Sequence, residues 1–337
     1  MRDTKTCKQE GNKIRDTRYQ IRKKGGSVRK RLLVVAVSVV IFGFIVNVVQ
    51  PVFAIEQKVD YRLMQKIEKA VESLSSKKGN ESRQAKKNLI KWGGASVEPL
   101  LEVAKDWKGQ EGALRVKCVD ILGELKDDRA VPVLISVLGE KKMTMRYNAA
   151  KALGKIGDNK AVPALIKLLS DPEWEVRFFT VEAIGDIGDV QAAKPLSNVL
   201  LSDSNKEVRL AAVEALDKID ARSETGVVVD ALSDDDAKVR GYAAELAASW
   251  KIVDAEATVV NMLRNDRVNV ARASCAHALG IYGNIASVPA LIQALRDDYK
   301  DVRIYAEQSL KKISGQSYGS DQDAWSRWFE LNKDKTE

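Results

Sequence analysis

Seven arginines recur at nearly constant spacing, and they are the charged side chains whose pattern could support binding chemistry. The intervals are 31, 31, 32, 31, 32 and 31 residues, at Arg115, Arg146, Arg177, Arg209, Arg240, Arg272 and Arg303. A row of guanidinium groups can bind phosphates. Acidic residues follow twelve positions later at Asp127, Asp158 and Asp189. The spacing therefore predicts carboxylate pairing within and between structural units, in place of phosphate binding.

The formal charge of +8 is concentrated at one end of the chain. Residues 1–31 contain 12 Lys and Arg against 3 Asp and Glu, which leaves 43 basic against 44 acidic residues elsewhere. A surface that binds nucleic acid normally carries a clear basic excess. Because the rest of the chain is nearly neutral, we expect no nucleic-acid partner.

Motifs for catalysis are missing from the sequence. A nucleophile needs a base beside it, yet the chain has one histidine, His277, which we expect on the surface. No Gly-rich phosphate loop, Cys-x-x-Cys pair or Gly-x-Ser-x-Gly elbow occurs. The acidic run Asp234-Asp235-Asp236 fits turn and capping roles better than metal binding. The sequence predicts a protein that is not an enzyme, with no catalytic residue, cofactor or metal site.

Each arginine belongs to a unit of two helices. Apolar or small residues stand three, four, six and seven positions after it, as in Cys118, Val119, Ile121 and Leu122. This is helical spacing with one buried stripe. Gly157 and Gly188 come where a left-handed C-cap is needed. A second helix begins near Pro163, since proline is tolerated in a first turn, and Ser170-Asp171 introduces the next unit as a turn and cap.

Such a helical hairpin cannot bury both its faces alone, whereas stacked hairpins share a continuous core. The sequence therefore predicts an all-α fold, a right-handed α-solenoid of about seven to eight hairpins. Cys118 and Cys275 occupy a column that other units fill with small residues such as Ala149 and Ala212. We expect both cysteines to be buried and unpaired.

The repeated pattern Val-Arg-x-x-Ala-Ala-x-Ala-Leu-Gly-x-Ile-Gly-Asp-x-x-Ala-Val-Pro-Ala-Leu resembles the short bacterial HEAT repeats. It is similar in particular to the HEAT-like repeats named after phycobilisome lyases. The resemblance covers residues 82–313 and implies a superhelical fold. It is poorly specific for function.

Two sets of side chains are candidates for partner binding. The first is a polar row on the second helices, two places before the last leucine of each: Ser136, Lys167, Asn198, Asp230, Asn261 and Gln293. The second set is aromatic and lies near the start of the first helices, at Tyr147, Phe178, Phe179, Tyr242 and Tyr305. If exposed, these rings form an interface ridge; the alternative is that they cover the seams between repeats.

The segment from Leu32 to Ile55 carries no charge, and Leu32–Val49 is almost entirely apolar. A helix of this length, at about 1.5 Å per residue, crosses a hydrocarbon core of about 30 Å. Basic residues precede it, so the positive-inside rule places the tail in the cytoplasm and the rest of the chain outside it. The alternative is a signal peptide cleaved after Ala54. Both interpretations predict a single-pass or exported protein of the cytoplasmic membrane with extracytoplasmic repeats.

The predicted organisation has five parts: a basic tail (1–31), a membrane or signal segment (32–55), a capping helix and linker (56–81), the repeats (82–313) and a Trp-rich C-terminal cap (314–337). Caps are expected because the ends of a repeat array must shield its core from water. The fourth and fifth repeats are irregular, since Asp217 and Ala248 replace a glycine and Trp250 replaces an isoleucine. A kink there is the preferred interpretation.

The sequence as a whole favours a non-enzymatic scaffold that binds an unidentified protein partner. Two alternatives stay open. The repeat resemblance implies a bilin-lyase-like factor acting on a protein substrate, and the aromatic residues Trp250, Trp325 and Trp328 suit a carbohydrate-binding module of the cell envelope.

Overall fold

The computed structural model describes residues 61–105 and 112–334, and every regular element in these ranges is a helix. None of those helices is both long and apolar enough to cross a membrane. The predicted basic tail and the apolar segment Leu32–Val49 lie outside the described ranges. The prediction of an all-helical repeat fold is thus confirmed for the described residues, while the hand of the superhelix stays a prediction.

The chain divides into two compact units, residues 1–133 and 134–337, and each is described by itself. The described part of the first unit contains α3 (Tyr61–Ser73), α4 (Gly79–Trp92), η1 (Gly93–Ser96), α5 (Val97–Lys105), α6 (Gly112–Leu125) and η2 (Asp128–Ala130). Helix α3 packs against α4, and α5 packs against α6. Helix α7 (Val131–Val137) spans the limit between the units.

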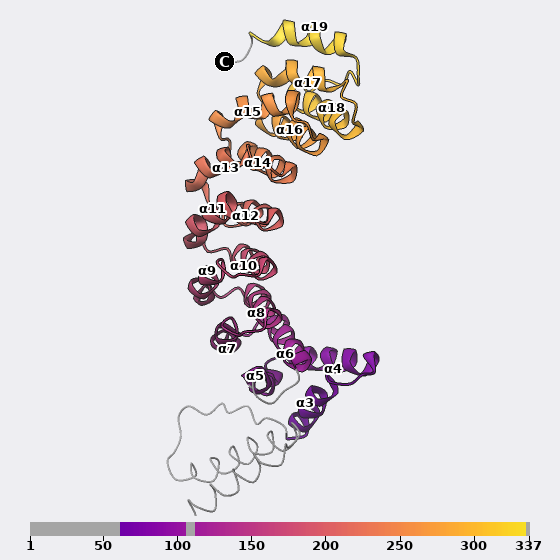
Figure 1. Ribbon diagram of the computed structural model, residues 1–337. Helices are drawn as coiled ribbons and strands as arrows, with labels where there is room; N and C mark the ends of the chain where they lie inside the picture. Colours follow the sequence, from indigo (N-terminus) through magenta and orange to yellow (C-terminus); the bar gives the residue numbers. More distant parts are fainter. Residues whose placement is uncertain (1–60, 106–111, 335–337) are drawn as a thin grey trace, which may run out of the picture. The chain divides into compact units, whose positions relative to one another are not determined.

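The described part of the second unit contains five helical hairpins, from α8/α9 to α16/α17, followed by two further helices, α18 and α19. Its elements are α8 (Met143–Ile156), η3 (Asn159–Ala161), α9 (Val162–Leu168), α10 (Trp174–Ile187), η4 (Val190–Ala192), α11 (Ala193–Ser202), α12 (Lys206–Lys218), η5 (Arg222–Glu224), α13 (Thr225–Ala231), α14 (Ala237–Ser249), α15 (Val253–Asn265), α16 (Asn269–Tyr282), η6 (Ile285–Ser287), α17 (Val288–Ala294), α18 (Lys300–Ser314) and α19 (Gln322–Asn332). The first helices α8, α10, α12, α14 and α16 stack in one layer, and α9, α11 and α13 stack beside them (Figure 1).

Small residues let the first helices approach closely. In α8, Ala149, Ala152 and Leu153 are buried, as the helical spacing predicts. A Cβ atom on Gly154 would lie 2.8 Å from the Cα of Ala183 in α10, which is too close for a side chain. Glycine at this position therefore sets the distance between the two helices.

The regular hairpin turns use a left-handed residue followed by a capping side chain. Gly157 has φ 79° and ends α8, as predicted for a C-cap. Asp158 then accepts a hydrogen bond from the backbone N–H of Lys160 and caps η3. Helix α9 begins at Val162 with Pro163 in its first turn. The turn therefore follows the pattern expected from the sequence.

The two irregular repeats keep this left-handed turn without glycine. Asp220 has φ 49° and Lys251 has φ 58° at the position of Gly157. A side chain in this region of backbone space costs about 1–2 kcal/mol. At Lys251 the strain is offset, because its Nζ donates to the main-chain oxygens of Ile281 and Tyr282 at the end of α16. The irregular sequence thus produces a strained turn that ties two repeats together.

Helix α19 follows α18 and packs against α17. Asp321 caps its N-terminus by accepting from the backbone N–H of Ala324. Trp325 is completely buried and donates from Nε1 to the main-chain oxygen of Gly319 at 2.8 Å. These contacts fit the expected capping role of the C-terminal segment. Because Trp325 is 0% and Trp250 only 7% exposed, neither ring is available to stack on a sugar.

Candidate functional site

Five of the seven marker arginines each form an ion pair with an aspartate in the loop that leads from their own hairpin to the next repeat of the second unit. The pairs are Arg146–Asp171, Arg177–Asp203, Arg209–Asp234, Arg240–Asp266 and Arg272–Asp297, here named the Arg–Asp ladder. In Arg177, Nε and Nη2 donate to the two carboxylate oxygens at 2.6 and 2.8 Å, and Nη1 donates to the main-chain oxygen of Asp171 at 2.9 Å. The arginines therefore hold loops in place and are not available to phosphates.

The expected pairing with carboxylates is present, but the acids named from the sequence are the wrong ones. Asp127, Asp158 and Asp189 cap the short helices of the hairpin turns. The true partners lie 25 or 26 residues after each arginine, in the loop that leads to the next repeat. In Arg115, Nε and Nη2 donate to the main-chain oxygen of Ala104.

The pKa values of the ladder carboxyls Asp203, Asp266 and Asp297 are lowered in the fold. Burial alone would raise the pKa of Asp203, but hydrogen bonds from Arg177 and from the backbone N–H of Asn205 lower it below its usual range. The hydrogen bond from Arg272 is the main reason that the pKa of Asp297 is also lowered. The Arg177–Asp203 and Arg272–Asp297 pairs are consequently charged at neutral pH, and the two charges of each pair neutralise each other.

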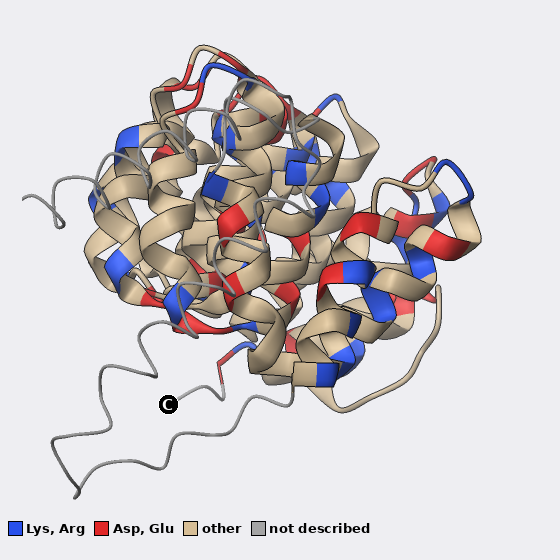
Figure 2. Ribbon diagram, turned by 90° about the horizontal axis from the view of Figure 1, so that it is seen from below, with Lys and Arg blue, Asp and Glu red and all other residues tan. Residues whose placement is uncertain are grey.

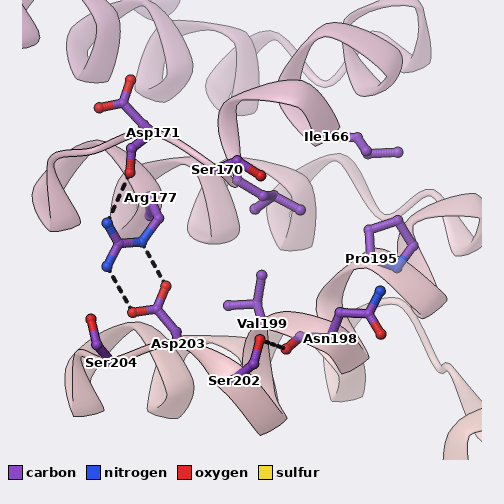
Figure 3. A pocket seen from close by; sticks show the side chains of 11 residues that line it. Ile166, Ser170, Asp171, Arg177, Pro195, Asn198, Val199, Ser202, Asp203 and Ser204 are labelled. Carbon is purple, nitrogen blue, oxygen red and sulfur yellow. Dashed lines mark hydrogen bonds and ion pairs between the residues drawn. The ribbon is translucent and has the colours of Figure 1, made fainter.

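A cavity of about 580 Å³ opens between two neighbouring repeats beside the ladder (Figure 3). It lies between the C-terminal parts of α9 and α11 and the loops that follow them. Its lining residues are Ile166, Leu169, Ser170, Asp171, Arg177, Pro195, Asn198, Val199, Ser202, Asp203 and Ser204. We call this cavity the α9–α11 pocket. Its volume is within the range of about 300–1,000 Å³ that is typical of ligand pockets.

The chemistry of the α9–α11 pocket suits binding more than reaction. Ile166, Pro195 and Val199 supply apolar surface, and Asn198 adds an exposed amide. The hydroxyl of Ser202 donates to the main-chain oxygen of Asn198 at 2.6 Å, so it is not paired with a base. A partner could insert an apolar side chain here and pair a peptide group with the Asn198 amide.

All six residues of the predicted polar row are exposed in the structure: Ser136, Lys167, Asn198, Asp230, Asn261 and Gln293. They stand on the second helices α7, α9, α11, α13, α15 and α17. Of the six, Asn198 lines the α9–α11 pocket. The row is therefore a solvent-facing set of polar groups, and its role in binding stays a prediction.

The five predicted aromatic residues do not share one environment. Tyr147 and Phe179 are half-buried, with ring centroids 5.3 Å apart, and Phe178 meets Phe179 edge-on at 5.2 Å. These three rings cover the contact between α8 and α10. Tyr242 and Tyr305 are 44% and 38% exposed. Tyr147, Phe178 and Phe179 thus cover a seam between repeats. The rings of Tyr242 and Tyr305 remain accessible to a partner.

The histidine and the two described cysteines lie in different environments. His277 is exposed, and its Nδ1 lies 3.4 Å from Glu245 Oε1. Cys118 and Cys275 are buried and free, and burial raises the pKa of each thiol to about 12. Within those ranges, no group of three or more His, Cys, Asp or Glu could hold a metal ion. Asp234 pairs with Arg209, and Asp236 caps α14, as expected for turn residues.

The sequence comparison identifies the repeats. The family described as HEAT repeats matches residues 97–173, 162–228 and 225–311, which together span more than half of the 337-residue chain. The chain belongs to the HEAT-repeat family. The family resemblance inferred from the repeated motif is therefore confirmed. A search of curated proteins by sequence finds no match.

Solved HEAT-like structures share the fold at low sequence identity. The Escherichia coli protein YibA is 20% identical, with a TM-score of 0.55 over 80% of this chain and 100% of its own. Kap95p, solved bound to RanGDP, is 15% identical, with a TM-score of 0.56 over 76% of this chain and 40% of its own. The CpcE–CpcF phycocyanin lyase complex from Nostoc is 22% identical, with a TM-score of 0.41 over 45% of this chain and 98% of that one. At these identities, the similarity to YibA and to Kap95p shows the fold alone.

Sequence reasoning missed most of the pocket that these HEAT repeats form. Ser170 and Asp171 were predicted as turn and capping residues, and Asn198 was the one lining residue predicted to bind a partner. One available signal was the second regular column, an aspartate 25 or 26 residues after each ladder arginine. The cavity itself had no signal, because it depends on how two neighbouring hairpins diverge.

Proposed function

We propose that this HEAT-repeat protein is a non-enzymatic scaffold that binds a protein partner along the exposed face of its second helices. The observation that carries the proposal is the α9–α11 pocket, which places apolar surface next to an exposed member of the polar row, Asn198. Interfaces gain most of their binding energy from a few side chains that fill such hollows. The remaining row residues would add polar contacts around this anchor.

Charge supports the choice of a protein partner over nucleic acid. Lys and Arg are interspersed with Asp and Glu on the helices in the view of Figure 2. The ladder arginines, which could otherwise bind phosphate, are already paired with carboxylates. Recognition would therefore depend on shape and on many modest contacts.

We extend the proposal to location. The uncharged segment Leu32–Val49 would tether the chain to the cytoplasmic membrane or direct its export, with the repeats on the far side. The sequence is the support for this part, and cleavage after Ala54 would release the repeats.

The scaffold proposal is tested by site-specific photocrosslinking in membrane fractions. A benzoylphenylalanine at Asn198 should yield one dominant crosslinked protein, whereas the same group at the exposed Glu214 of α12 serves as a control on a first helix. Asn198→Arg should fill the pocket and abolish capture of that protein by a crosslinker at Asn261, while Asn198→Ser should preserve it.

Two outcomes would contradict the scaffold. Equal crosslinking from Asn198 and Glu214 would show that the pocket face is not the binding surface. Purification with a bound tetrapyrrole that absorbs visible light would support the bilin-lyase-like alternative instead.

A further inference from the structure

The Arg–Asp ladder has an open end at Arg303. The Nη1 atom of Arg303 donates to the main-chain oxygens of Asp297 and Asp298 at 2.6 and 2.9 Å. Arg240, inside the ladder, makes the same two contacts at 2.6 and 3.1 Å with the loop before its own helix. The guanidinium of Arg303 is therefore oriented like those of the paired arginines.

The Nε and Nη2 edge of the Arg303 guanidinium lacks the aspartate carboxylate that pairs with this edge in the ladder arginines. In Arg240, Nε and Nη2 donate to both carboxylate oxygens of Asp266, at 2.7 and 2.8 Å. The positions 25 and 26 residues after Arg303 hold Trp328 and Phe329, which have no carboxylate. Within the described ranges, Nε and Nη2 of Arg303 make no hydrogen bond or ion pair.

The open edge of Arg303 is reachable from solvent. Among the described residues, one side-chain nitrogen or oxygen is both buried and without a partner, and it is Nε1 of Trp250. The unpaired nitrogens of Arg303 are therefore not sealed inside the protein. The nearest ladder acid, Asp297, is already neutralised by Arg272. The loop acid Asp298 and the helix acid Asp301 form no ion pair with Arg303, although both are exposed beside it.

We propose that Arg303 is a carboxylate-binding site that receives an aspartate side chain from a loop of a protein partner. A guanidinium group and a carboxylate can form two parallel N–H···O hydrogen bonds. Because the guanidinium of Arg303 is planar and already held by its contacts to the loop, it loses little conformational entropy on binding. The partner residue is inferred to be aspartate in a turn. All five ladder aspartates also accept a hydrogen bond from the backbone N–H two residues ahead. The partner is a protein because the inference rests on the proposed scaffold function.

The first test compares the reactivity of single arginines in the full-length protein. Treatment with p-hydroxyphenylglyoxal, followed by mass-spectrometric peptide mapping, should modify Arg303 several-fold faster than Arg177 and Arg240. An acetylated and amidated Gly-Asp-Gly peptide at millimolar concentration should slow the modification of Arg303. The matched Gly-Asn-Gly peptide should not, and the exposed Arg267 should react equally in all samples.

Two results would overturn the carboxylate site: modification of Arg303 as slow as that of Arg177, or equal effects of the two peptides. The variant Arg303→Gln should melt at nearly the wild-type temperature and bind the Asp peptide about ten-fold more weakly. Unchanged peptide affinity in a folded Arg303→Gln protein would equally exclude the site.

The outcomes for the two proposals are separable. Protection of Arg303 by the Asp peptide without specific crosslinking from Asn198 would remove the scaffold function and leave the carboxylate site. Specific crosslinking from Asn198 without protection of Arg303 would leave the scaffold and remove the site.

Discussion

Gly154 shows how strongly one atom can constrain the repeat array. Gly154 lies against the backbone of Ala183, and a Cβ added to Gly154 would be 2.8 Å from the Cα of Ala183. Backbone cannot move aside as a flexible side chain does. We therefore expect Gly154→Ala to push α8 and α10 apart and to lower the free energy of unfolding by about 1–3 kcal/mol, measured by urea denaturation.

Gly226 in α13 provides the matched control, since a Cβ there would meet nothing within 4 Å. Gly226→Ala should be neutral, or stabilising by about 0.5–1 kcal/mol, because alanine favours the helix. Equal effects of the two substitutions would show that close helix approach at Gly154 is not important.

The two buried cysteines should behave as packing residues. Burial raises the pKa of the Cys118 and Cys275 thiols to about 12, so little thiolate exists at neutral pH. We expect both to react with a disulfide reagent such as Ellman's reagent only after unfolding in guanidinium. Rapid modification of either cysteine in the native protein, located by mass spectrometry, would contradict this assignment.

At the scale of elements, the Arg–Asp ladder links each first helix to the loop that follows the second helix of the same hairpin. The pKa values of Asp203, Asp266 and Asp297 are lowered in the fold, so the unfolded chain takes up protons first as the pH falls. Their stabilisation is complete above about pH 5 and is lost as the pH falls through about 4 and below. The melting temperature should decline across this range.

Replacing one ladder acid tests this pH dependence. Asp203→Asn keeps the shape but leaves the Arg177 charge poorly compensated, at a cost of about 2–3 kcal/mol at pH 7. In melting curves followed by circular dichroism, the decline between pH 5 and 3 should be shallower than in the wild type. A variant with the wild-type acid profile would show that the pair does not govern it.

Helix α19 should depend on a single anchoring side chain. Trp325 is completely buried, packs edge-on against Tyr318 at 4.8 Å and holds Gly319 through its indole N–H. Trp325→Ala should cost about 3–5 kcal/mol and release α19, detected as rapid proteolysis of residues 315–321. Trp325→Phe, which keeps most of the apolar area, should lose much less.

The helices could be predicted from the sequence, whereas the ladder partners and the pocket could not. Spacing of buried residues such as Leu153 specifies a helix locally, and Gly157 marks its end. The pairing of Arg177 with Asp203 depends on how α11 folds back along α10, which brings residues 26 positions apart into contact. The left-handed backbone conformation of Lys251 could not be predicted from the sequence either, because its strain energy is offset by hydrogen bonds to the next repeat.

At the scale of the whole molecule, the proposed topology has a direct test. Alkaline phosphatase fused after residue 56 should be active, because the enzyme folds outside the cytoplasm and the apolar segment precedes the fusion point. A fusion after residue 31 should be inactive and serves as the control. An inactive fusion after residue 56 would place the repeats in the cytoplasm and exclude the proposed location.

The nearly constant sequence separation between the arginine and the aspartate of each ladder pair affects how the repeat array can change in length. Every ladder arginine finds its acid 25 or 26 residues ahead, inside the span of one repeat and its following loop. Duplication of a 31- or 32-residue coding segment would therefore supply both members of a new ion pair at once. Evolution could lengthen or shorten the array in whole steps without leaving an orphaned charge at the junction.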